Sequence, residues 1–278
     1  MPELPEVETV KRTLEHQLKE RKIISVQINR PEIIAHPSSA AFTQNITGQK
    51  IAEMGRRGKF LSICLENGDT IWLHLRMTGR LLVTPPDFPK EAHTHLVFCL
   101  DDGMEIRFMD TRRFGRFWLL KKGEEDTFTG MNKLGPEPLS GILTAEWLEA
   151  RIGKRKKSIK ECLLDQSVVA GIGNIHGDEI LFCARICPGR PAFSLKKAEW
   201  QRLADAIVAM LKKGIEDNRM TPQEYLEGRG KGYRMAPFLQ VYGQDGQPCP
   251  RCKTTLRRIV LSGRSSVYCP ECQKEDAI

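Results

Sequence analysis

The sequence predicts an α+β protein with an N-terminal β-sandwich or flattened barrel and flanking helices, a mainly helical middle part and a small C-terminal cysteine unit. Three observations predict this class: a helical apolar repeat at the start, short strand-like runs over the next hundred residues, and two matched cysteine pairs near the end. The 278 residues suffice for two domains of ordinary size. We expect the N-terminal domain at 1–133, the helical domain at 134–245 and the cysteine unit at 246–278.

The first predicted element is a helix over residues 4–20. Pro5 suits the first turn of a helix, and Glu6 is favoured at the positive end of the helix dipole. One apolar stripe results from residues spaced three and four apart, namely Val7, Val10, Leu14 and Leu18.

Residues 2–130 otherwise show strand-like patterns. The runs "KIISVQI", "FLSICLENGDTIWLHLRM" and "HLVFCLDDGMEIRFMD" are rich in β-branched and aromatic residues. "NGD" and "DDG" interrupt two of them and predict hairpin turns. We expect a sandwich or a flattened barrel.

In the middle of the chain, the spacing of apolar residues changes from a strand-like to a helical pattern. "LGPEPLS" at 134–140 predicts a linker, because two prolines interrupt any regular element. Helical spacing dominates residues 144–214. We expect a polar, glycine-rich loop at 217–235.

Composition and charge narrow the class of protein. No apolar run approaches the ~20 residues of a membrane-spanning helix, and no signal peptide is visible, so we expect a cytoplasmic protein. The net charge of +8 and the pI near 9.0 suit a polyanion such as nucleic acid, although solubility alone also explains them.

The four C-terminal cysteines predict a metal site. "CPRC" and "CPEC" form a C-x2-C, sixteen-residue, C-x2-C pattern, and four thiolates select Zn²⁺ with no open coordination position. We therefore expect one structural zinc ion in a hairpin, held by Cys249, Cys252, Cys269 and Cys272.

Basic and glycine-rich turns recur along the chain. "GRRGKF" at 55–60, "DTRRFGR" at 110–116, "GKRKKSIK" at 153–160 and "AGIGNIHGDEILF" at 170–182 are each a candidate phosphate contact, the last because helix N-termini bind phosphate. Each alone also fits a solvated surface. Their recurrence favours a duplex held mainly through its backbone.

These motifs together resemble one family, the bacterial formamidopyrimidine-DNA glycosylases. The matching segments run over essentially the whole chain, in the family's order: "MPELPEVETV", "RRGKF", "HLRMTGR", "DTRRFG", "LGPEPL", "LLDQSVVAGIGNI" and "GRSSVYCPECQ". The resemblance implies a β-sandwich, a helix–two-turn–helix motif and a zinc-finger hairpin. It also implies excision of oxidised purines from double-stranded DNA, followed by strand cleavage at the abasic site by β,δ-elimination.

The resemblance implies four catalytic residues. Removal of Met1 exposes the nitrogen of Pro2, which attacks C1′ and forms a Schiff base, while Glu3 protonates the sugar ring oxygen. Lys59 donates a proton in β-elimination and Arg264 assists the second elimination; phosphate binding is the alternative role for both. Glu6 matches a second family acid, or serves only as a helix N-terminal carboxylate.

A base-flipping wedge is also implied. Met77 fills the space left by the base, Phe114 enters between neighbouring bases, and Arg112 binds the orphaned partner, preferably cytosine. Met77 and Phe114 as core residues are the alternative. The expected DNA-backbone contacts are His74, His93, Arg112, Arg155, Lys156 and Asn174. Arg155 and Lys156 compete for one role, and His93 alternatively pairs with His95.

Three departures from the family pattern affect specificity. His176 replaces a usual tyrosine, Thr78 stands where some members have glutamate, and a proline and acidic residues interrupt the lesion-capping loop at 217–235, where only Thr221 and Tyr225 match. The alternatives are an endonuclease VIII-type enzyme for oxidised pyrimidines and a catalytically silent binder of damaged DNA. We expect a monomer in the bacterial cytosol.

Overall fold

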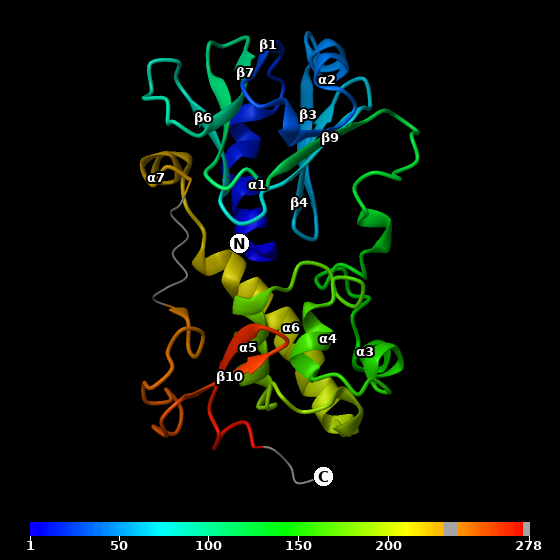
Figure 1. The fold of residues 1–278 in the computed structure, drawn as a ribbon, viewed down its shortest axis with the longest axis vertical. Coiled ribbons are helices and arrows are strands. Elements are labelled where there is room, and N and C mark those ends of the chain that lie inside the picture. The colour runs from blue at the N-terminus through cyan, green and yellow to red at the C-terminus, as the bar shows by residue number, and fades with distance from the viewer. Residues whose placement is uncertain (231–237, 275–278) are drawn as a thin grey trace. The chain divides into compact units, whose positions relative to one another are not determined.

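The computed structural model describes residues 1–230 and 238–274 and contains two compact units. The first consists of Met1–Asn132 and Asn218–Tyr233, and the second of Lys133–Asp217 and Arg234–Ile278. The fold is α+β, as expected, with a β-sheet unit and a helical unit (Figure 1). The cysteine hairpin belongs to the helical unit.

Two β-sheets form the first unit, and their strands pair antiparallel except for one parallel pair in the second sheet. One sheet has the order β1 (Ile23–Ile28), β7 (Thr94–Leu100), β8 (Glu105–Asp110) and β6 (Gly79–Thr84). The other has the order β2 (Ile34–His36), β9 (Arg116–Leu120), β5 (Thr70–His74), β4 (Phe60–Leu65) and β3 (Ile51–Arg57). Phe117 of the second sheet packs against Phe98 and Phe108 of the first, with ring centroids 6.4 and 4.9 Å apart. The sheets therefore share one apolar core.

The hairpin turns predicted from "NGD" and "DDG" are confirmed. The first joins β4 to β5 and the second joins β7 to β8. Gly68 and Gly103 have φ of +90° and +80°, a conformation that glycine adopts without steric cost.

Helix α1 (Leu4–Leu18) begins as predicted and ends two residues earlier, because Glu20 has a left-handed φ of +69°. Its predicted stripe is at most 1% exposed. The helix packs against β3 and β4 of one sheet and β6 of the other, which places its N-terminus at the sandwich (Figure 1). The short elements η1 (Pro31–Ile33) and α2 (Ser39–Ile46) complete the segment before β3.

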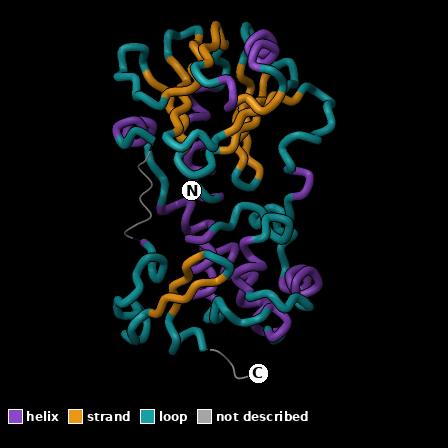
Figure 2. Tube along the Cα trace, in the orientation of Figure 1, coloured by secondary structure: helices purple, strands orange, loops and turns teal. Residues whose placement is uncertain are grey.

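The second unit is mainly helical. After η2 (Met131–Lys133) come α3 (Ala145–Ile152), α4 (Ile159–Leu164), α5 (Asn174–Ala184), η3 (Ala192–Ser194) and α6 (Lys197–Asp217). Their apolar faces form a second core, in which Leu148, Ile180 and Leu203 are fully buried. Hairpin β10 (Arg257–Leu261) and β11 (Arg264–Tyr268) packs on α5 through β11 (Figure 2).

The expected loop at 217–235 is wrong as a description of residues 222–227, which form helix α7 (Pro222–Glu227). The proline and acidic residues that interrupt the family pattern are helix-start signals. Thr221 is the N-cap and forms a capping box with Glu224, while Pro222 occupies the first turn. Tyr225, 1% exposed, donates a hydrogen bond to the carbonyl of Leu81, so α7 belongs to the first unit. Residues 231–235 of the expected loop lie outside the described residues.

Candidate functional site

The N-terminal proline and glutamate lie at the start of α1. Pro2 is buried and Glu3 is 2% exposed. Glu3 is the N-cap residue, and its backbone N–H donates to the carboxylate of Glu6 over 2.6 Å. Glu6 therefore has the helix-capping role that the sequence left open, and it fixes the backbone on which Pro2 and Glu3 stand.

Lys59 lies in the tight turn between β3 and β4 and is 7% exposed. Arg56 braces this turn: its Nη1 donates to the carbonyl of Gly58 over 3.0 Å, and its Nε donates to Glu8 of α1 over 2.9 Å. Burial alone would raise the pKa of Glu8, but hydrogen bonds from Arg56 and Arg12 outweigh it and lower that pKa. A charged bridge thus ties the Lys59 turn to the helix that begins beside Pro2.

His74 ends β5 as a buried neutral imidazole. Burial, followed by the charges of Arg76 and Lys59, lowers its pKa from 6.5 to about 3. Its Nδ1 accepts the N–H of Arg76 over 2.9 Å, so the proton of the neutral ring is on Nε2. His74 therefore offers one fixed donor that keeps its proton at neutral pH.

The structure brings Met77, Arg112 and Phe114 together from two loops. Met77 and Phe114 are each 47% exposed, so neither is a core residue. Arg112 donates to the Met77 sulfur over 3.0 Å, and its Cζ lies 4.8 Å from the centroid of the Phe114 ring. The three side chains form one exposed cluster, which we call the loop triad.

A buried aspartate holds the two triad loops. Asp110, fully buried, accepts the N–H of Arg112 and the N–H of Gly115 over 3.1 and 2.8 Å. Thr78, beside Met77, donates its hydroxyl to the same carboxylate. Thr78 is thus a structural link between the loops. Sequence reasoning missed Asp110, for which the available signal was an acid directly at a strand end, followed by a turn.

His93 and His95 lie in different environments. His95 is 4% exposed, and its Nε2 lies 2.8 Å from the carbonyl oxygen of Asp110. His93 is half-buried in the loop before β7, with its ring 6.3 Å from that of His95. The side chain of His93 is therefore partly exposed to solvent, whereas His95 is a buried structural residue.

The helical unit places three further predicted residues around α4 and α5. Arg155 pairs with Asp165 over 2.9 Å, while Lys156 is exposed. Asn174 is the first residue of α5, and its side-chain N–H donates to the carbonyl of Ser265 in β11 over 3.1 Å. The α5 N-terminus and the hairpin are therefore directly connected.

Arg264 is exposed at the tip of the β10–β11 hairpin. The two connecting residues, Ser262 and Gly263, have φ of +46° and +76°, which is the type I′ geometry that closes two-residue hairpins. Arg264 is the first residue of β11 and follows directly after this turn, so the turn geometry sets the direction of its side chain.

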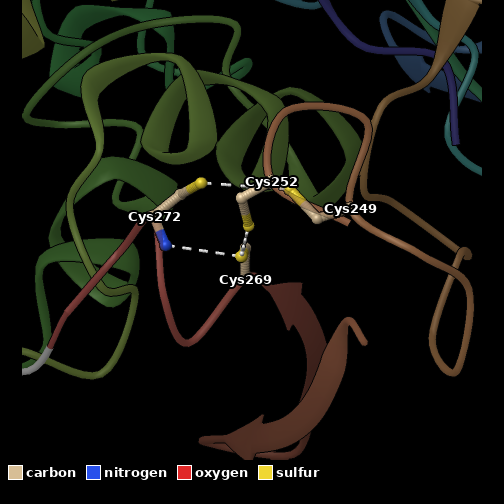
Figure 3. A group of neighbouring side chains, drawn as sticks. All are labelled: Cys249, Cys252, Cys269 and Cys272. Carbon is tan, nitrogen blue, oxygen red and sulfur yellow. Dashed lines mark hydrogen bonds between the residues drawn. The ribbon is translucent and has the colours of Figure 1, made fainter. Parts of the chain in front are cut away.

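The four C-terminal cysteines form one cluster, which confirms the predicted metal site. Their sulfur atoms lie within 4.8 Å of one another, with Cys252 and Cys269 at 3.4 Å and Cys249 and Cys272 at 3.9 Å (Figure 3). Zn–S bonds of about 2.3 Å in a tetrahedron require sulfurs about 3.8 Å apart. The donor set and spacing fit one Zn²⁺, and four protein ligands make the site structural.

Family comparison covers both units. The formamidopyrimidine-DNA glycosylase N-terminal domain matches residues 1–117, the H2TH domain of the same enzyme matches 134–224, and a zinc finger found in FPG and IleRS matches 246–274. The formamidopyrimidine-DNA glycosylase of Pelotomaculum thermopropionicum is 44% identical over 99% of both chains, and that of Moorella thermoacetica is 47% identical over 93% of this chain and 94% of the relative.

Solved structures agree with these matches. A complex of Lactococcus lactis Fpg with DNA containing an oxidised pyrimidine has a TM-score of 0.90 at 33% identity and covers 99% of this chain and all of that one. A complex of the same protein with an abasic-site DNA has a TM-score of 0.87 at 32% identity, with 98% and 100% coverage. Within residues 1–230 and 238–274, no helix combines the length and apolarity needed to cross a membrane.

A β-sandwich with an N-terminal proline–glutamate pair, joined to a helical unit with a four-cysteine hairpin, defines the zinc-finger class of DNA glycosylases. The two relatives named above cover 99% and 93% of this chain, at sequence identities of 44% and 47%. The chain belongs to the formamidopyrimidine-DNA glycosylase family. The relatives named above are all formamidopyrimidine-DNA glycosylases, so neither alternative considered from the sequence is favoured.

Proposed function

We propose that this protein is a base-excision repair enzyme that removes oxidised purines from double-stranded DNA and then cleaves the abasic site as a lyase. The observation that supports this most is the buried Pro2–Glu3 pair at the start of α1, in a chain of this family. A nucleophile and a proton donor on consecutive residues suit a reaction at a sugar carbon and its ring oxygen.

The loop triad supplies the base-extrusion step. Taking a nucleotide out of the stack costs a few kcal/mol, and filling the hole offsets this cost. Met77 and Phe114 are exposed apolar side chains suited to insertion, and Arg112 between them has donors for the acceptors of the orphaned base, preferably cytosine.

Excision begins when the Pro2 nitrogen, exposed by removal of Met1, attacks C1′ of the extruded nucleotide. An α-amino group has a pKa of about 7.7–8.0, so a sizeable fraction is neutral and nucleophilic near pH 7.5. The C1′–base bond breaks with its electron pair leaving on the base, and the base takes up the proton that the proline nitrogen loses on attack. Glu3 protonates the ring oxygen as the sugar opens, and the proline nitrogen and C1′ then form a cationic Schiff base.

Strand cleavage follows from the positive charge on this Schiff base. The charge acidifies the C2′ proton, and loss of that proton expels the 3′ phosphate; a second elimination expels the 5′ phosphate. Lys59, in its braced turn, donates a proton in the first step, and Arg264 stabilises phosphate charge in the second. The zinc site does not take part in these steps, because its four thiolates leave no position open.

The remaining predicted residues bind the DNA backbone. His74 presents its Nε2 proton, and His93, Lys156 and Asn174 add donors or charge. Arg155 is held by Asp165, so Lys156 is the better candidate for the role that these two neighbours share.

A panel of duplexes tests this function. The protein should excise 8-oxoguanine and formamidopyrimidines paired with cytosine faster than oxidised pyrimidines, and it should leave phosphates at both ends of the gap. Pro2→Gly should lose most cleavage and keep DNA binding, whereas Pro5→Gly, at the second residue of the helix, should cleave. Cleavage by Pro2→Gly at the parental rate would refute the assigned nucleophile.

A further inference from the structure

The zinc-finger hairpin is attached to the helical unit by polar contacts well beyond the zinc ligands. Four polar side chains from α4 and α5 bond to residues 262–267: Lys160, Glu161, Asn174 and Asp178. Arg264 lies within the stretch that they hold.

The contacts along β11 centre on a buried ion pair. Lys160 and Asp178 are each 1% exposed and lie 2.6 Å apart. Lys160 also donates to the carbonyl of Ser265 over 3.0 Å, and Asp178 accepts the hydroxyl of Ser266 over 2.5 Å and the N–H of Val267 over 3.1 Å. Such a pair is stable only when each charge has further hydrogen bonds, as it has here. The body of β11 is therefore firmly docked.

A separate hydrogen bond holds the tip of the hairpin. Ser262, in the left-handed conformation at φ +46°, donates its hydroxyl to Glu161, the third residue of α4. The other oxygen of Glu161 accepts from the Ser158 hydroxyl over 2.6 Å. Hydrogen bonds from Ser158 and then Ser262 lower the pKa of Glu161, so the contact has an ionised acceptor at neutral pH.

The direction of Arg264 depends on this tip. Arg264 pairs with Leu261 across the turn, and the turn residues Ser262 and Gly263 are both exposed. Serine pays a conformational cost at positive φ that glycine does not. Without the bond to Glu161, the exposed turn keeps the pairing of Leu261 with Arg264 but loses its direct hydrogen bond to α4.

We propose that Glu161 is a positioning residue, which holds the hairpin tip through Ser262 and thereby aims Arg264 at the DNA phosphate expelled in the second elimination. The inference rests on the proposed lyase function for its kinetic readout. Glu161 itself need not touch DNA, and its effect passes through Arg264.

The test measures the two eliminations separately on a duplex with a preformed abasic site. Glu161→Ala and Ser262→Gly should each slow the second elimination relative to the first by about tenfold, the factor that a charge-assisted hydrogen bond of about 1.4 kcal/mol supplies. Base excision at saturating protein and zinc content should stay near parental values. Ser262→Gly accommodates the left-handed turn geometry and removes the hydroxymethyl side chain that carries the hydroxyl.

Two comparisons separate positioning from general loosening. The quantity compared is the ratio of the second-elimination rate to the first-elimination rate. In an Arg264→Ala background, Glu161→Ala should have no further effect on this ratio. Ser158→Ala removes the other hydroxyl on the same carboxylate, which is also the N-cap of α4, and leaves the bond to Ser262 in place; it should lower the ratio less than Glu161→Ala does. An unchanged ratio in both Glu161→Ala and Ser262→Gly, or an equal fall in the Arg264→Ala background, would overturn the proposal.

Affinity for an uncleavable tetrahydrofuran duplex gives a second readout. Glu161→Ala should weaken binding in the parent and not in Arg264→Ala. If the parent cleaves no abasic site, the proposed lyase function fails, but this affinity comparison still decides the role of Glu161. Equal weakening of binding in the parent and in Arg264→Ala would refute the positioning role of Glu161.

Discussion

Arg112 donates a hydrogen bond to the sulfur of Met77 over 3.0 Å, although the two residues are 35 positions apart and lie on different loops. The contact connects the side chain proposed to bind the orphaned base with the one proposed to replace the lost base. We expect the two to act as a unit during base extrusion.

Replacing Arg112 tests this unit. Arg112→Ala should slow excision of 8-oxoguanine opposite cytosine by about fivefold or more, because a good bidentate contact contributes about 1–3 kcal/mol of discrimination. The preference among opposite bases should flatten as well. Arg113→Ala, an equal loss of charge at the next residue, is the matched control. Single-turnover excision against each normal base provides the measurement, and equal effects of the two variants would contradict the assignment.

Thr78 links the triad loops through buried Asp110, so its hydroxyl should contribute to stability. Thr78→Val should lower the free energy of unfolding by about 1–3 kcal/mol, the usual cost of leaving a buried acceptor short of a hydrogen bond. Thr78→Ser keeps the hydroxyl and should stay close to the parent. Urea denaturation at pH 7 measures the difference, and a valine variant as stable as the serine variant would rule out this link.

His74 should make the protein sensitive to acid. Its folded pKa is about 3 against an ordinary value of 6.5, so between these values the unfolded chain binds a proton that the folded chain does not. The free energy of unfolding therefore falls as pH drops below 6.5, by up to about 1.4 kcal/mol per pH unit from this group. In His74→Gln this component is absent. Urea denaturation from pH 7.5 to 5 should show a shallower slope for the variant, and parallel slopes would refute a buried neutral His74.

Zinc should be needed for DNA binding through the hairpin. Cys252→Ser should lose the metal and weaken binding to an abasic-analogue duplex, because the strands that hold Arg264 lose their closure. Cys183→Ser, a half-buried thiol outside the cluster, is the control and should keep one zinc per chain. Metal content and affinity are measured on the same preparations; lost zinc with unchanged affinity would disprove the connection.

Features with a local signal could be predicted from the sequence. The α1 stripe, the glycine turns and the paired cysteines each leave a period or a spacing that depends on neighbours in the chain. The start of α7 also left a signal, since Thr221, Pro222 and Glu224 form a standard helix start. The resemblance to a flexible loop obscured it.

Features that depend on distant partners could not be predicted. Arg56 bridges Glu8 and the Lys59 turn, Asp110 holds a loop 32 residues away in the chain, and Lys160 contacts a strand 105 residues later. No periodicity marks such side-chain contacts. The motif resemblance named the residues of the site, and only the fold shows which ones support them.

Excision and strand cleavage both depend on the Pro2 nitrogen as the nucleophile. Borohydride reduction of the protein with 8-oxoguanine DNA, followed by proteolysis and mass spectrometry, locates the covalent bond directly. We expect one adduct, on the N-terminal nitrogen of a chain that starts at Pro2. An adduct on Lys59 or another lysine, or full activity from a chain that retains Met1, would contradict the account.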